Sequence, residues 1–160
     1  MSADSKRAAL PADTSPLGRP SRRRVRLGLI VTLFGFFVLA VGAKPGWFGL
    51  DRSPAVGFVQ ITVFLIGLAI ICLGGYISLP ALWPKGQRSI AADIGLRLVG
   101  TGYVVAVFTG MADVFGMGTQ SLPNVPYFGP WQATGVVVGQ ALIAVGFLLL
   151  IPWRNRKSAL

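Results

Sequence analysis

Four long apolar stretches constrain this 160-residue chain more than any other feature. In the hydrocarbon core of a bilayer, every backbone N–H and C=O group needs a partner within the protein, so an apolar stretch of about 20 residues forms a helix. The sequence predicts spans at about residues 27–43, 54–79, 89–112 and 131–151. It therefore predicts an all-α integral membrane protein, a bundle of four transmembrane helices.

Composition agrees with this fold class. Hydrophobic residues make up 53% of the chain and charged residues only 12%, against about 25% charged residues in a soluble domain. We expect a disordered basic cytoplasmic tail over residues 1–24, a membrane domain over 25–153, and a short basic tail over 154–160. The spans leave little chain for a soluble domain.

Lysine and arginine predict the orientation, because they concentrate in the cytoplasmic loops of membrane proteins. With both termini in the cytoplasm, only Lys44 and Arg52 lie outside, and Arg97 lies within a span. The other basic residues are then cytoplasmic: Lys6, Arg7, Arg19, Arg22, Arg23, Arg24, Arg26, Lys85, Arg88, Arg154, Arg156 and Lys157. A bacterial-type plasma membrane fits this pattern. Arg22, Arg23, Arg24 and Arg26 are expected to contact anionic lipid.

The first span has a competing interpretation as a cleaved signal. The sequence from Ser21 to Val25 resembles a twin-arginine export signal, and Val41-Gly42-Ala43 resembles a signal-peptidase site. Twin-arginine export carries folded soluble cargo, however, whereas the rest of this chain is apolar. We therefore expect an uncleaved membrane anchor.

Glycines recur at helical spacing within the spans. Those of the first span repeat every seven residues, and the fourth span carries a GxxxG pair. Small residues on one helix face let two membrane helices approach closely. We expect the following glycines to pack helices within the molecule: Gly28, Gly35, Gly42, Gly67, Gly74, Gly102, Gly110, Gly135 and Gly139.

A faint internal repeat is a further hypothesis. The sequence Trp47-Phe48-Gly49 precedes Gln60 by the interval that separates Tyr127-Phe128-Gly129 from Gln140, which is an offset of 80 residues. The molecule would then consist of two tandem two-helix hairpins. Four matching positions in apolar sequence can also arise by chance.

The sequence lacks most catalytic residue types. It has no histidine and no glutamate, which excludes histidine-ligated haem, zinc chemistry of the HExxH type and Ser-His-Asp hydrolysis. The single cysteine, Cys72, lies within the second span and cannot form a disulfide in the chain or a thiolate cluster. We predict no catalytic residue, no metal site and no cofactor.

Six polar or charged side chains are candidates for a functional role: Asp93, Arg97, Gln60, Gln140, Asp113 and Arg52. Ionisable groups at membrane depth are costly and often functional. Asp93 and Arg97 have the spacing of an intrahelical ion pair at the cytoplasmic interface. The two glutamines need partners, either each other or Thr62, Thr101 or Tyr103, or else they line a polar cavity. Asp113 is expected to meet Arg52 or Lys44, or to cap backbone amides.

The leading functional expectation is a non-catalytic accessory or structural subunit of a larger membrane complex. Its basis is the missing catalytic inventory, the glycine-rich faces and an uncharged, apolar loop at 114–130. The alternatives are a small channel or transporter, also as a homo-oligomer, and a protein that binds lipid or quinone. The expected partners are the lipid bilayer and other membrane subunits or a second copy, and no nucleic acid.

Overall fold

The computed structural model of the protein describes residues 22–50, 57–83, 88–117 and 128–152. These contain four long helices, α1 (Arg22–Ala43), α2 (Phe58–Ser78), α3 (Ile90–Gly110) and α4 (Pro130–Leu150). Two short 3₁₀ helices, η1 (Pro45–Phe48) and η2 (Pro80–Leu82), follow α1 and α2. Each long helix is long and apolar enough to cross a membrane. The prediction of an all-helical bundle with four candidate spans is confirmed.

Local chemistry explains where two of the helices begin. At α3, the Ser89 side chain accepts a hydrogen bond from the Ala92 N–H at 3.2 Å, which satisfies a free amide of the first turn. At α4, proline occupies the first helical position, where its missing N–H costs nothing. The Gln132 side chain then accepts a hydrogen bond from the N–H of Gly129 at 2.8 Å.

One predicted boundary differs from the structure, and another falls outside the described residues. Residues 22–24, expected in a disordered tail, form the first turn of α1. Hydropathy marks where a helix enters hydrocarbon, but arginine is a good helix former and the helix extends into the polar region. The second helix begins at Phe58 after Gly57, and its expected start at residue 54 lies outside the described residues, as do 1–21 and 153–160.

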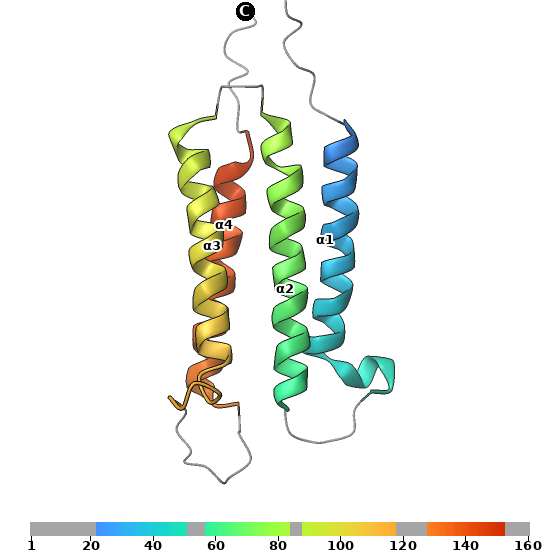
Figure 1. Cartoon of the computed structure of the whole chain (residues 1–160), viewed down its shortest axis with the longest axis vertical. Coiled ribbons are helices and arrows are strands. Elements are labelled where there is room, and N and C mark those ends of the chain that lie inside the picture. The colour runs from blue at the N-terminus through green and yellow to red at the C-terminus, as the bar shows by residue number, and fades with distance from the viewer. Residues whose placement is uncertain (1–21, 51–56, 84–87, 118–127, 153–160) are drawn as a thin grey trace, which may run out of the picture.

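The helices pair along the chain (Figure 1). Helix α1 packs closely against α2, and α3 against α4, while α2 and α3 make a smaller contact that joins the two pairs. We call α1 with α2 the first hairpin and α3 with α4 the second hairpin. The starts of α1 and α3 lie at the same end of the molecule as the ends of α2 and α4 (Figure 1).

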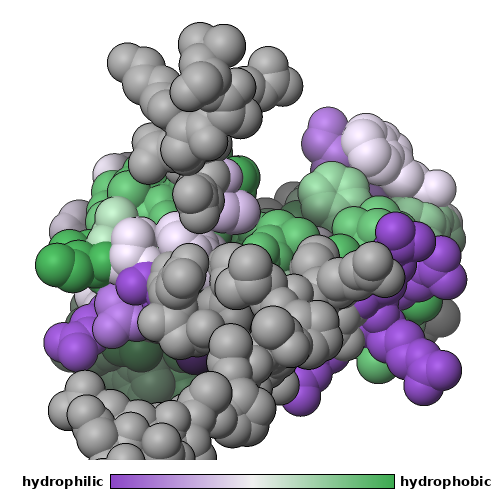
Figure 2. Space-filling view, turned by 90° about the horizontal axis from the view of Figure 1, so that it is seen from above, coloured by the Kyte–Doolittle hydropathy of each residue, from purple (hydrophilic) through white to green (hydrophobic). Residues whose placement is uncertain are grey.

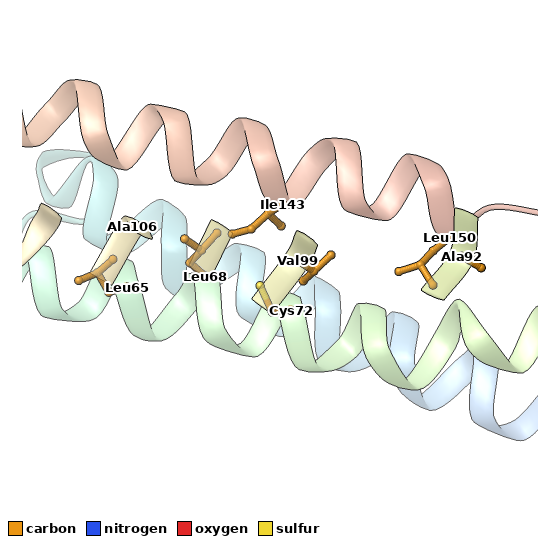
Figure 3. Packing of buried hydrophobic residues seen from close by; sticks show 8 residues of the cluster. All are labelled: Leu65, Leu68, Cys72, Ala92, Val99, Ala106, Ile143 and Leu150. Carbon is orange, nitrogen blue, oxygen red and sulfur yellow. The ribbon is translucent and has the colours of Figure 1, made fainter. Parts of the chain in front are cut away.

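The buried apolar cluster lies between α2 and the second hairpin. Leu65, Leu68 and Cys72 of α2 point toward α3 and α4 (Figure 3). The remaining members come from α3 and α4: Ala92, Val99, Ala106, Ile143 and Leu150. Helix α1 contributes none of them. Its buried residues are three glycines, so every large apolar side chain of α1 faces outward at least in part.

Candidate functional site

Backbone-to-backbone contact holds the first hairpin together. A methyl group added at Gly28 would lie 2.7 Å from the Gly74 carbonyl oxygen, and one at Gly35 would lie 2.7 Å from the Ile71 amide nitrogen. Gly42 lies against the Phe64 backbone in the same way. Any side chain larger than hydrogen would force the helices apart, because the neighbouring atoms are backbone atoms. We call this contact the first glycine interface: Gly28, Gly35, Gly42, Gly67 and Gly74.

The second hairpin has a similar contact. A methyl group at Gly102 would lie 2.6 Å from the Gly139 carbonyl oxygen, and one at Gly139 would lie 2.6 Å from the Gly102 carbonyl oxygen. Gly95 and Gly146 approach each other's carbonyl oxygens one heptad further along. These four residues form the second glycine interface. Sequence reasoning missed Gly95 and Gly146, although their seven-residue spacing from Gly102 and Gly139 was a visible signal.

Two expected packing glycines have side-chain atoms as their nearest neighbours. For a methyl group at Gly110 the nearest atom would be Val136 Cγ2 at 3.3 Å, which leaves some room. Gly135 is only partly buried but lies tightly against the Thr109 side chain, whose Cβ would be 2.6 Å from an added methyl group.

The two glycine interfaces use equivalent contacts. Gly35 meets the Gly67 carbonyl and the Ile71 amide, and Gly102 meets the Gly139 carbonyl and the Ile143 amide. Corresponding residues of α1 and α3, the first helices of the two hairpins, are 67 positions apart. Those of α2 and α4, the second helices, are 72 positions apart.

The predicted offset of 80 residues is not supported. Gly49 follows the 3₁₀ helix η1, whereas Gly129 immediately precedes α4. Gln60 lies two residues into α2, but Gln140 lies ten residues into α4. By its distance along the helix, the counterpart of Gln60 is Gln132.

A partly open pocket of about 290 Å³ lies between the hairpins, at the end of the bundle where α1 ends and α4 begins. Its lining comes from α1, α2 and α4, together with Phe128 just before α4. The walls are mainly apolar, with Ile61, Phe64 and Val136 among them. Gln60 and Gln140 also line it, and no charged side chain of the described residues does. The structure therefore brings the two predicted glutamines to one cavity.

Neither glutamine side chain makes a hydrogen bond within the described part of the chain. The threonines expected as partners are otherwise occupied, because each described threonine donates to the carbonyl four residues earlier on its own helix. Thr62 donates to Phe58 at 2.9 Å and Thr101 to Arg97 at 3.0 Å. In a membrane this arrangement satisfies the hydroxyl without a second helix. The two amides remain available to a ligand.

Two of the charged candidates, Asp93 and Arg97, lie away from this pocket. Asp93 and Arg97 are both exposed near the start of α3, at the opposite end of the bundle, and no ion pair joins two described residues. Asp113 lies in the turn after α3. Its predicted partner Arg52 falls outside the described residues. The other predicted partner of Asp113 is Lys44, whose ammonium group instead lies 5.1 Å from the centre of the Trp47 ring.

The sequence did not predict two hydrogen bonds that join the hairpins. The Tyr76 hydroxyl of α2 donates to the Leu96 carbonyl of α3 at 2.6 Å. The Trp83 indole N–H donates to the Leu150 carbonyl at the end of α4 at 2.8 Å. Tyrosine and tryptophan place an apolar ring in a helix contact and a polar tip at a partner, but nothing in the sequence identifies which carbonyl each tip meets.

The described residues form no site suited to metal or thiol chemistry. No group of three or more His, Cys, Asp or Glu side chains comes together there, and Cys72 is a buried free thiol within the apolar cluster. The pocket with its two amides is the arrangement best suited to bind a small molecule. Comparisons of the chain with protein-family models, with curated proteins and with solved structures found no match.

Proposed function

We propose that the protein is a non-catalytic polytopic membrane protein that serves as a small accessory or structural subunit of a larger membrane complex. The observation that carries this proposal is the outward face of α1. The fully buried residues of this helix are all glycines, and six of its large side chains remain exposed for other contacts: Leu29, Ile30, Leu33, Phe34, Phe36 and Phe37, each 55–62% exposed. Van der Waals packing contributes to the association of membrane helices, and these side chains offer a surface for it.

The proposal includes an orientation and an internal repeat. Both ends of the chain are cytoplasmic, in a bacterial-type plasma membrane, because Arg22, Arg23, Arg24 and Arg26 gather at the start of α1. Figure 2 looks onto this end, where hydrophilic side chains lie over α1. The equivalent contacts of the two glycine interfaces support two tandem hairpins with offsets of 67 and 72 residues.

Purification in mild detergent from the native membrane tests the subunit role. We expect the tagged wild-type protein to carry stoichiometric partners, detected by size analysis and mass spectrometry. The combined substitution Leu29→Ala, Leu33→Ala and Phe36→Ala should release them, because it removes the outward face of α1 and spares the first glycine interface.

A matched control truncates an outward face elsewhere. Ile94→Ala, Val104→Ala and Phe108→Ala remove side chains of α3 that are 48–65% exposed, and partners should remain bound. A wild-type protein that purifies as a monomer without partners would contradict the subunit role.

A small channel or transporter is the alternative function. Within one chain, Asp93 and Arg97 lie at the end of the bundle opposite the pocket that holds Gln60 and Gln140, so these residues outline no path together. A clean homo-oligomer in the same purification would favour this alternative, since a path could then form between copies. Solute flux into liposomes would be the next measurement.

A further inference from the structure

The pocket between the hairpins has the features of a ligand site rather than of a packing gap. Helices α1 and α4 are not among the closely packed pairs, so their sides leave room over α2. Gly42 of α1 belongs to this lining and adds no side chain to fill the space. At about 290 Å³, the pocket is near the lower limit of the roughly 300–1,000 Å³ typical of small-molecule sites.

The polar groups of the pocket select an uncharged ligand. Gln60 and Gln140 each offer an N–H₂ donor and a carbonyl acceptor. Among the described residues, no lysine or arginine lines the cavity, so the phosphate of an anionic lipid would lack a cationic partner from them. No described aspartate lines it either, so a cation would lack a counter-charge from these residues.

The depth of the two amides further restricts which ligands can contact both of them. Gln60 is two residues from the start of α2 and Gln140 ten residues from the start of α4, which corresponds to about 3 Å and 15 Å along the helices. Through their side chains, two donors at different depths can reach carbonyl groups on opposite edges of a ring that lies between them. The Phe64 and Phe128 rings also line the pocket and can pack against a flat, apolar ring.

We propose that this pocket binds the head group of an uncharged lipid-soluble quinone, with Gln60 and Gln140 donating hydrogen bonds to its two carbonyl oxygens. The isoprenoid tail leaves through the open side of the pocket into the bilayer. The site binds the quinone without changing its redox state, because no described side chain at the pocket can supply protons or electrons. This inference goes beyond the subunit role and does not depend on it.

Binding of radiolabelled decylubiquinone to the full-length protein in nanodiscs tests the proposal, with empty nanodiscs to subtract partition into lipid. The wild-type protein should bind it saturably. Gln60→Leu and Gln140→Leu should each weaken binding by about three- to tenfold, as expected for loss of one hydrogen bond. Thr134→Val, a polar-to-apolar change on α4 outside this pocket, should leave the affinity unchanged.

A second measurement does not rely on the variants. A photoreactive quinone analogue should label wild-type peptides around residues 60–64 and 133–140, and excess decylubiquinone should prevent the labelling. Non-saturable uptake by the wild-type protein, labelling elsewhere, or folded variants with unchanged affinity would overturn the proposal. Competition by phosphatidylglycerol or diacylglycerol but not by unlabelled decylubiquinone would also overturn it, in favour of a lipid site. None of these outcomes bears on partner association.

Discussion

At the scale of single residues, glycine determines how closely these helices approach. Gly102 and Gly100 are two positions apart on α3, yet their surroundings differ. A methyl group at Gly102 would lie 2.6 Å from the Gly139 carbonyl oxygen, whereas one at Gly100 would meet only the Tyr76 hydroxyl at 3.5 Å. The first contact is with backbone and cannot give way, while the second is an ordinary van der Waals contact.

This difference predicts opposite effects of the same substitution. Gly102→Ala should lower the free energy of unfolding by about 1–3 kcal/mol, because the second hairpin must separate to admit the methyl group. Gly100→Ala should leave it unchanged or raise it by up to about 1 kcal/mol, since alanine favours the helix. Titration of unfolding in mixed detergent micelles measures both. Equal effects at the two positions would refute the close backbone approach.

At the scale of helices, side chains rather than backbone join the two hairpins. The Phe147 ring of α4 covers Gly75 of α2, and the Tyr76 and Trp83 hydrogen bonds add polar links. Membrane helices gain little from the hydrophobic effect once they are inserted, so each hydrogen bond is a sizeable part of such a contact.

Two tyrosines allow a matched test of this link. Tyr76→Phe should lower the free energy of unfolding by about 0.5–1.5 kcal/mol, since the bond to the Leu96 carbonyl is lost. Tyr103 is also partly buried, but its hydroxyl makes no hydrogen bond within the described residues. Tyr103→Phe should therefore have a smaller effect in the same unfolding assay. A larger loss of stability from Tyr103→Phe than from Tyr76→Phe would disprove the link between α2 and α3.

The helices themselves could be predicted from the sequence, but their contacts only in part. The length of the four apolar stretches predicted the four spans, because hydrocarbon permits only helices there. The stripe of glycines at 28, 35 and 42 indicated a close contact without naming its partner helix. Gln132 was overlooked because its hydrogen bond to the N–H of Gly129 is a local feature of the helix start. The pocket forms where α1 and α4 do not pack closely against each other. The spacing of apolar residues and glycines along each helix does not predict which helices stay apart.

At the scale of the whole molecule, charge sets the expected orientation. The proposal places the start of α1 in the cytoplasm, so a green fluorescent protein fused after Leu160 should fluoresce and an alkaline phosphatase fused there should be inactive. Changing Arg22, Arg23, Arg24 and Arg26 to glutamine should give a mixture of orientations, because the first span loses its largest basic cluster. The control substitution Lys44→Gln should leave the orientation unchanged. An active phosphatase on the wild-type chain would exclude the orientation.

The glycine interfaces also give the molecule a mechanical character. Within each hairpin the backbones touch, so the two helices move as one stiff unit. Between the hairpins the contacts are made by side chains, including the buried apolar cluster between α2 and the second hairpin. A small change in the angle between the hairpins would therefore rearrange these side chains and leave both glycine interfaces intact. The pocket is lined from both hairpins, so its width would follow that angle.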